Sequence, residues 1–424
     1  MTSSGTVITF YSYKGGTGRT MALANVGALL SNWGYRVLCL DWDLEAPGLH
    51  LYFERWSQAF NAQGLVEFID ARDDDWRNYV TEVWFPGAPI SLHFIPAGRF
   101  DETYVQRMQG LDWPLLYEKY DLGSRLESLR EEWKEEYDFV LIDSRTGVTD
   151  IGGICTIQMP DQLVLLFTAN HQSLGGTLEV AKRAAEQRNH LPFDRAGLSC
   201  VPVPSRFEGL VEMDLKKEWL DIFADRLEPL YRAWADQEVF PRQLLDLVRI
   251  PYVAYWSFGE KMPVLDEGTK APETIGFAIE TLAALLAHRL AGTALLVRNR
   301  DEFVDTARQV NATETTLRLV QSAAAEDLHR VEISFEGQGT VRQSTTSIFP
   351  FLFSEDDQRD LRWYLEDYLQ APEEPAPRIA ARVERRISEI GAELFNAIFN
   401  GRRRPPSLGD APCAAQRDSC QDRD

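Results

Sequence analysis

The chain has 424 residues, a hydrophobic fraction of 44% and a formal net charge of −21, so it is long enough for two or three domains with sizeable cores. A chain this acidic should as a whole repel nucleic acid and anionic lipid, although a local basic patch could still bind either. Its five cysteines have no metal-ligand spacing, which argues against zinc and a disulfide framework and suits a reducing cytoplasm. We find no signal-peptide pattern and no apolar run near the ~18 residues of a membrane-spanning helix.

Short apolar strands alternate with helical patterns through the first two-thirds of the chain. The predicted strands cover residues 7–11, 36–41, 92–96, 139–143, 162–168 and 198–204. The predicted helices cover residues 20–31, 124–136, 174–189, 215–234 and 271–290. Continuous apolar strands separated by helices are typical of a parallel sheet covered on both faces. We therefore expect an α/β fold with a doubly wound, mostly parallel sheet.

The amphipathic helix at 271–290 is expected to close this domain, which then covers residues 1–290. Within it, the charged and aromatic segment 101–136 is interpreted as a helical insertion that packs beside the sheet. A partner-binding surface is the alternative interpretation of that segment.

The sequence changes character after residue 290. A short strand pair at 328–335 and 340–344 is expected to precede helices at 354–369 and 377–399, which a Pro-rich stretch joins. Ser354 and the acidic residues after it mark the start of the first helix. Residues 291–400 are thus predicted to form a small, mainly helical module, and residues 401–424, which lack periodicity, a disordered tail.

The most informative segment is a glycine-rich loop, YSYKGGTGRT at residues 11–20, between a predicted strand and a predicted helix. A phosphate-binding loop needs that context, and a simple turn is the alternative. Glycines let backbone amides surround phosphate oxygens, the helix start directs its dipole at them, and a threonine hydroxyl suits Mg²⁺. The residues assigned to nucleotide binding here are Gly15, Gly16, Thr17, Gly18, Arg19, Thr20 and Met21.

The loop resembles the deviant Walker A motif, KGGxxK[ST], of ParA/MinD-type P-loop ATPases. The resemblance implies that Lys14 is a catalytic residue that reaches across an ATP-sandwich dimer to the partner's nucleotide. Arg19 stands where the family has a lysine. It keeps the charge but is planar and forked, so we expect phosphate binding to be retained and the hydrolysis rate to be the property at stake.

Two further segments place carboxylates at strand ends, where α/β sheets hold ligand chemistry. VLCLDWDLEAPGL at 37–49 resembles the family's switch I, which implies that Asp43 positions or deprotonates the attacking water and that Asp41 stabilises the loop and the metal shell. A pair of exposed loop carboxylates is the alternative. YDFVLIDSRTG at 137–147 resembles a Walker B strand followed by switch II. The metal ligands implied are Thr20, Asp41 and Asp143, the last through water.

Two weaker matches follow, and with them the resemblance spans residues 5–290. VPVPSR at 201–206 matches the place where the family contacts the base, which assigns Pro204 and Arg206 to nucleotide binding. An ordinary solvated arginine is the alternative at Arg206. The segment 250–265 resembles the late strand and loop before the closing helix.

Other functions hosted by this fold are not expected. Iron-protein reductases need two cluster cysteines per subunit, and only Cys155 is near a suitable loop. Bacterial tyrosine kinases carry a tyrosine cluster in the tail, whereas residues 401–424 contain no tyrosine. The basic, amphipathic segment 378–404 would suit a membrane surface, but packing against the preceding helix is the simpler use of its apolar face.

The segment FPFLFSEDDQRDLRWYLEDYLQAP at 349–372 resembles a short module found before CHAT-type caspase-like protease domains. No protease is expected in this chain, because no Cys/His pair lies in a predicted element after it. The segment is interpreted as an adaptor or regulatory module. A helical hairpin that only completes the core is the alternative.

Together these patterns predict a cytoplasmic, slow Mg²⁺-dependent ATPase that uses ATP and Mg²⁺. It would form a homodimer through ATP and signal to a protein partner through the C-terminal module. A non-catalytic nucleotide sensor is the alternative, and a DNA- or membrane-associated partitioning ATPase is a third. Nucleic acid and membrane are not expected as partners.

Overall fold

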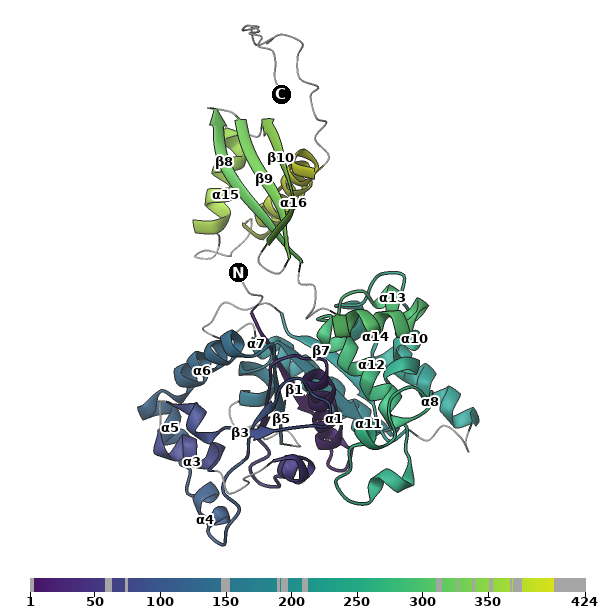
Figure 1. Cartoon of the computed structure of the whole chain (residues 1–424). Coiled ribbons are helices and arrows are strands. Elements are labelled where there is room, and N and C mark those ends of the chain that lie inside the picture. Colours follow the sequence, from purple (N-terminus) through teal and green to yellow (C-terminus); the bar gives the residue numbers. More distant parts are fainter. Residues whose placement is uncertain are drawn as a thin grey trace, which may run out of the picture. The chain divides into compact units, whose positions relative to one another are not determined.

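The structure is a computed structural model that describes residues 4–57, 63–72, 75–145, 153–188, 191, 197–207, 213–309, 315–325, 328–337, 340–350, 354–366, 368 and 376–399. The chain forms two compact units, Met1–Asn311 and Ala312–Asp424, each with its own sheet and helices (Figure 1). None of the described helices is both long and apolar enough to cross a bilayer.

The first unit is built on a seven-stranded sheet in the order β3-β4-β2-β5-β1-β6-β7. The strands are β1 (Thr6–Tyr11), β2 (Val37–Asp41), β3 (Thr81–Val83), β4 (Leu92–Ile95), β5 (Phe139–Asp143), β6 (Gln162–Phe167) and β7 (Ser199–Pro204). All neighbours are parallel except the edge pair β3–β4. The predicted strands and the mostly parallel sheet are confirmed. The edge strand β3 was not predicted, because three residues are too short for an apolar pattern to show.

Helices cover both faces of this sheet. They are α1 (Arg19–Asn32), α2 (Leu49–Phe53), α3 (Leu65–Ala71), α4 (Tyr104–Gln109), α5 (Trp113–Tyr120), α6 (Leu122–Glu136), α7 (His171–Arg188), α8 (Met213–Arg226), α9 (Glu228–Arg232), α10 (Pro241–Val248), α11 (Pro263–Asp266), α12 (Ile275–Ala287), α13 (Thr293–Arg298) and α14 (Arg300–Gln309). Single helical turns occur at η1 (Glu54–Trp56), η2 (Trp76–Tyr79), η4 (Ile154–Gln158) and η5 (Ala254–Ser257). The strands β1, β5 and β6 are buried along their whole length, which explains their mostly apolar sequences.

Successive strand residues enter different cores, as the pleat requires. Ile8 and Phe10 pack in the core that contains α1 and α12. Val7 packs in the opposite core, which contains α3 and α6. The doubly wound arrangement predicted from the sequence is therefore confirmed.

The segment 101–136 forms α4, α5 and α6. Leu126 and Trp133 of α6 are buried in the same core as Val7 and Val140 of the sheet. The last of these helices is therefore part of the layer that covers β1 and β5. The shorter α4 and α5 lie further along that core, with Tyr104 and Leu116 buried.

The first unit extends to Asn311, past the boundary placed at residue 290. Phe303 of α14 is 1% exposed and packs in the core that contains α12. The Tyr35 hydroxyl donates to the Ala307 carbonyl at 2.8 Å, and Arg300 pairs with the buried Glu280 at 2.8 Å. These contacts explain why the first unit extends past residue 290. The polar residues of α14 partly obscure, in the sequence, the apolar face that the helix buries.

The unit boundary can be tested with a core residue and a surface residue of the same helix. Phe303→Ala should lower the free energy of unfolding by about 3–5 kcal/mol, the usual cost of removing a buried Phe side chain. Asp301→Ala, whose side chain is 86% exposed, should change it by less than about 0.5 kcal/mol. Urea unfolding followed by tryptophan fluorescence measures both. Equal effects would show that α14 does not pack on the first unit.

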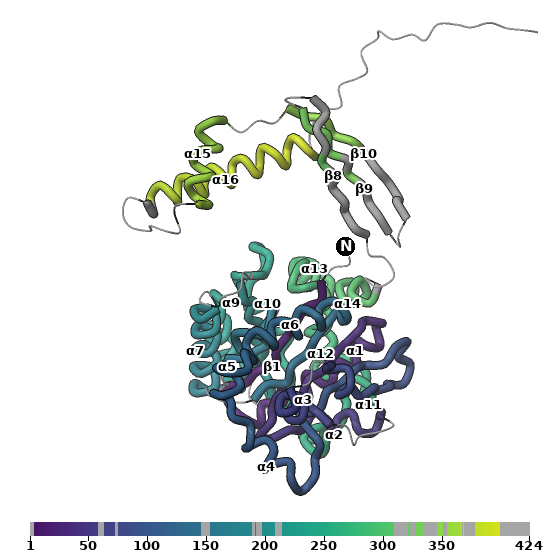
Figure 2. The backbone as a smooth tube through the Cα atoms, turned by 90° about the vertical axis from the view of Figure 1, so that its left-hand side faces the viewer, coloured from purple at the N-terminus to yellow at the C-terminus, as the bar shows by residue number. Residues whose placement is uncertain are grey.

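The second unit contains an antiparallel sheet in the order β10-β9-β8 and two helices (Figure 2). Its elements are β8 (Thr315–Ala325), β9 (Leu328–Gly337), β10 (Thr340–Pro350), α15 (Glu355–Glu366) and α16 (Ala376–Phe399). The predicted strand pair and both predicted helices are present, and Ser354 Oγ accepts the Asp357 amide at 3.0 Å as the helix start predicts. Strand β8 was missed. The predicted tail at 401–424 lies outside the described residues.

A small core joins this sheet to α16. Val331, Ile333 and Phe349 are buried there, and Leu394 and Ile398 pack against them. The apolar face of α16 is therefore used at least partly inside the unit, against the sheet, whereas the sequence predicts that it packs against the preceding helix.

Candidate functional site

The glycine-rich loop lies between β1 and α1, at the carboxyl end of the sheet. Gly16 and Gly18 have φ values of 74° and 82°, in the left-handed region that favours glycine. A Cβ added at Gly15 or Gly16 would meet no atom within 4 Å, so these residues border open space. The loop conformation therefore depends on glycine at 16 and 18, and its backbone is free of covering side chains at 15 and 16.

The ring of Tyr13 packs the start of this loop against α7. A Cβ at Gly176 would lie 2.2 Å from that ring, whereas a Cβ at Gly175 would meet nothing within 4 Å. Glycine at 176 thus provides the space that the ring occupies. Lys14, the next residue, is half-buried and forms no ion pair with any residue in the described part of the chain.

Arg19 binds two carboxylates from different strand ends. Its Nε donates to Asp143 Oδ1 at 2.5 Å and its Nη2 to Asp43 Oδ2 at 2.8 Å. The three side chains are 6%, 1% and 11% exposed. Burial disfavours the charged guanidinium, but the two carboxylates outweigh it and raise the pKa of Arg19 above its ordinary value. The arginine therefore stays charged in this ion-pair cluster.

Thr20 and Asp143 meet at the base of the loop, where the Thr20 hydroxyl donates to Asp143 Oδ2 at 2.7 Å. Burial raises the pKa of Asp143, an effect that Arg19 and the Thr20 hydrogen bond oppose. Asp41 is fully buried, and its Oδ2 accepts the Leu49 amide at 3.1 Å. Burial and the nearby Asp143 raise the pKa of Asp41 well above its usual range. Asp41 thus joins the end of β2 to the start of α2 through the Leu49 amide.

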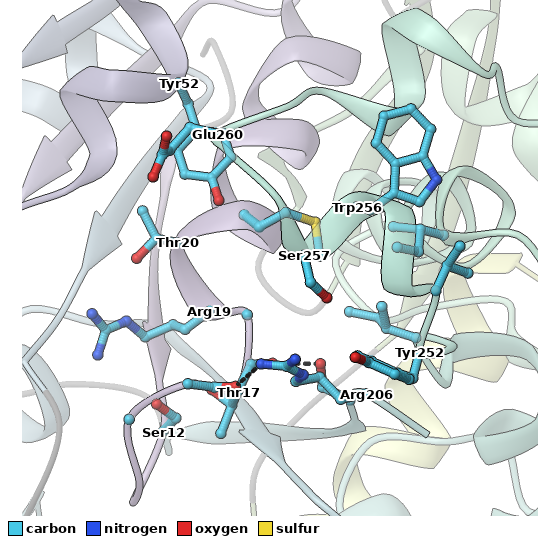
Figure 3. A pocket seen from close by; sticks show the side chains of 18 of the residues that line it. Ser12, Thr17, Arg19, Thr20, Tyr52, Arg206, Tyr252, Trp256, Ser257 and Glu260 are labelled. Carbon is cyan, nitrogen blue, oxygen red and sulfur yellow. Dashed lines mark hydrogen bonds between the residues drawn. The ribbon is translucent and has the colours of Figure 1, made fainter. Parts of the chain in front are cut away.

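A cavity of about 470 Å³ opens beside the loop. Figure 3 shows Arg19 and Thr20 on one side of it and Tyr252 and Trp256 on the other. The lining residues from the glycine-rich loop and α1 are Ser12, Gly15, Gly16, Thr17, Gly18, Arg19, Thr20 and Met21. Asp43 lines it as well, whereas Lys14, Asp41, Asp143 and Pro204 do not.

The end of β7 is joined to the glycine-rich loop by two side chains. Ser205 Oγ donates to the Thr17 carbonyl at 2.6 Å, and Arg206 Nη1 donates to the Gly16 carbonyl at 2.9 Å. The Arg206 guanidinium also lies 5.1 Å from the centre of the Tyr252 ring. Arg206 is exposed, and its guanidinium contacts both the loop and Tyr252. Pro204 instead pairs within the sheet, and its carbonyl accepts the Ile250 amide at 2.8 Å.

The unused polar atoms around the cavity fit a polar ligand with a metal ion. Ser12 Oγ, Thr17 Oγ1 and Arg19 Nη1 are buried and have no hydrogen-bond partner among the described residues. Thr20 and Asp143 supply the oxygen donors that Mg²⁺ prefers. No group of three or more His, Cys, Asp or Glu side chains in the described ranges is placed to hold a metal by itself. A Mg²⁺ ion here would therefore need ligand oxygens and water to complete its coordination.

Comparisons with known proteins agree with the motifs. No family model matches the chain. It is 25% identical over 177 residues to a protein named as septum site-determining protein MinD from Oltmannsiellopsis viridis, covering 40% of this chain and 47% of that protein. It is 26% identical over 183 residues to a protein named as tyrosine-protein kinase EpsB from Ralstonia solanacearum, covering 43% of this chain and 21% of that protein. The chain thus spans about half and about a fifth of these relatives.

The predicted resemblance to MinD-type proteins is confirmed. Among solved structures, the cell division ATPase MinD of Pyrococcus furiosus overlaps with 68% of this chain and all of its own, at 20% identity and a TM-score of 0.47. The strand order and the glycine-rich loop of this chain, rather than that overlap, define its fold.

Several cavity residues were not predicted from the sequence. Those with polar or aromatic side chains are Ser12, Tyr52, Ser205, Tyr252, Trp256, Ser257 and Glu260. Four of them come from the segment 250–265, whose closely spaced aromatic residues were the available signal. Ser12 and Ser205 lie inside the motifs at 11–20 and 201–206, whereas Tyr52 lies in no motif.

The predicted switch II is only partly described. Arg145 pairs with Glu45 of the loop after β2 at 2.7 Å, whereas Thr146 and Gly147 lie outside the described residues. The start of this segment is thus in contact with the loop that carries Asp43.

The contact between Tyr13 and α7 leads to a matched pair of variants. Gly176→Ala should displace the Tyr13 ring and lower the thermal unfolding temperature, because the new Cβ would overlap the ring. Gly175→Ala should raise stability by about 0.5–1 kcal/mol, since it adds helix propensity in open space. Differential scanning calorimetry compares them. A Gly176→Ala protein as stable as Gly175→Ala would show that Tyr13 is not held in this way.

Proposed function

We propose that the first unit binds ATP with Mg²⁺ and works as a nucleotide-dependent switch. The observation that carries this proposal is the Thr20–Asp143 hydrogen bond at the base of a glycine-rich loop that borders an open cavity. A helix start, exposed loop backbone, a hydroxyl and a strand-end carboxylate are the parts from which phosphate-binding sites of this type are built.

At the phosphate end, the amides of residues 15–20 surround the phosphates, and the first turn of α1 adds its dipole. Thr20 and Asp143 would hold a bound Mg²⁺, Asp143 through water, and the ion would supply positive charge that offsets that of the phosphates. Asp41 is buried, and its carboxylate accepts a hydrogen bond from the Leu49 amide. From this position behind the loop it supports the metal shell.

At the base end, the nucleotide base lies between the end of β7 and the segment 250–257. Arg206 and Tyr252 form a stacked pair beside the loop, and Trp256 lines the same cavity. Planar rings of this kind favour a flat base. The family resemblance implies adenine. Pro204 does not line the cavity. The contact with the base that was expected of Pro204 is therefore assigned to Ser205 and Arg206 instead.

Hydrolysis is assigned to Asp43 and Lys14. Asp43 lines the cavity and positions the attacking water, and Lys14 reaches the nucleotide of a second copy in a homodimer. Loss of the terminal phosphate then releases the loop after β2 and the segment at Arg145, which the Glu45–Arg145 ion pair already joins. The second unit passes this change to a protein partner.

The setting of this switch is proposed to be the cytoplasm, with neither DNA nor a membrane as partner. The net charge of −21 supports this, because DNA and anionic lipid would be repelled. The activity of the relative named as a tyrosine-protein kinase is not transferred to this chain, which spans a fifth of it.

A non-catalytic nucleotide sensor is the second candidate, and Arg19 is the observation that favours it. Arg19 is tied to Asp43, the residue that would position water. An arginine that keeps this contact would allow binding while it blocks turnover.

Lys14→Ala separates nucleotide binding from dimerisation. The variant should bind ATP and Mg²⁺ with calorimetric heat similar to the wild type, because Lys14 does not line the cavity of its own chain. It should remain monomeric in light scattering with ATP, whereas the wild type should dimerise. Absence of heat with the wild-type protein would overturn the nucleotide site, and dimers that persist in the variant would overturn the role of Lys14.

Arg19→Lys separates the switch from the sensor. If the wild type releases phosphate in a single turnover, it is an ATPase, and the lysine variant should change its rate by less than about tenfold, or about 1.4 kcal/mol of activation free energy. A wild type without turnover whose Arg19→Lys variant hydrolyses ATP would establish the sensor.

A further inference from the structure

The position of Arg19 has a consequence beyond its place in the phosphate-binding loop. It follows the last glycine of the loop, yet its guanidinium lies against Asp43 and Asp143. Asp143 uses one oxygen for Arg19 and the other for Thr20. Both carboxylate oxygens that a metal ion could use are therefore already engaged.

The cluster is largely buried although it borders the cavity, so the balance of charge within it matters. The guanidinium is the one cation that these two buried carboxylates contact in the described residues. A divalent ion next to Asp143 would lie within a few ångströms of it, and like charges at that distance repel strongly where water is excluded. The guanidinium and a metal ion thus compete for the same carboxylates.

The Arg19 side chain also has a hydrogen-bond donor left for another partner. Its Nη1 is buried and makes no hydrogen bond to a described residue. The loop that carries Arg19 borders the open cavity where phosphates are proposed to lie. Arginine binds phosphate in a forked geometry, so phosphate oxygens offer its guanidinium a full set of acceptors.

We propose that Arg19 is an internal counter-cation that holds Asp43 and Asp143 in the ligand-free protein and leaves them when nucleotide and metal bind together. It is a positioning residue that prevents the metal site from forming before phosphate arrives. A lysine could not do this equally well, because one ammonium lacks the fork that spans two carboxylates. This inference rests on the proposed nucleotide site.

The test uses the full-length protein without nucleotide and Mn²⁺ as a substitute for Mg²⁺. Free Mn²⁺ is measured by electron paramagnetic resonance, at one fixed pH for all variants. Arg19→Gln should bind one Mn²⁺ per chain about tenfold more tightly than the wild type, or better, because the competing charge is gone. Adding Asp143→Asn to that variant should remove the gain.

Arg206→Gln is the matched control, because Arg206 borders the same cavity but binds a carbonyl instead of a carboxylate. It should bind Mn²⁺ as weakly as the wild type. If Arg19→Gln does not fold, Arg19→Lys should give an intermediate gain.

Two results would overturn the inference. One is a folded Arg19→Gln protein that binds Mn²⁺ no better than the wild type. The other is a nucleotide-free wild type that already binds one Mn²⁺ per chain as tightly as the variant. Because no nucleotide is present, either result is separate from a failure of ATP binding, which calorimetry detects.

Discussion

The parallel pairing of β5 between β1 and β2 determines where the chemistry of this protein can occur. In that register, Asp143 lies opposite Phe10 of β1 and opposite Asp41 of β2. Parallel strands end at the same edge of a sheet, so the loops that follow these three strands meet there. The glycine-rich loop, the loop with Asp43 and the start of the segment at Arg145 are neighbours for this reason, although Asp143 is 124 residues from Arg19 in sequence.

This convergence has an electrostatic cost. Three aspartates gather at one sheet edge, and burial raises the pKa values of Asp41 and Asp143 by penalising their charged forms. The protein offsets the cost in two ways. Arg19 neutralises Asp43 and Asp143, and the high pKa of Asp41 favours its uncharged form. A buried ion pair adds little net stability over apolar packing, so the cluster is better explained by its function in the site than by stability.

The parallel arrangement of the strands also explains where the cavity lies. β7 lies two strands from β1, on the other side of β6, and its carboxyl end brings Ser205 and Arg206 against the glycine-rich loop. The segment after α10 then adds Tyr252 and Trp256. One wall of the cavity is therefore formed by loop backbone and a carboxylate, and the other by aromatic rings. This arrangement suits a ligand that is charged at one end and flat at the other. The second unit has its own sheet and core, and its function follows from none of these contacts.

The sequence by itself determined the α/β fold, six of the seven strands and the three motifs that meet at the site, because these depend on local patterns of glycine, apolar runs and strand-end aspartates. It also identified Arg19 as the unusual residue. Only the tertiary structure decided where Arg19 lies, since its two partners come from strand ends remote in sequence. The aromatic wall, the exclusion of Pro204 from it and the extension of the first unit to Asn311 were likewise decided by packing between distant segments. No local pattern records such packing, because it depends on which faces meet once the sheet has formed.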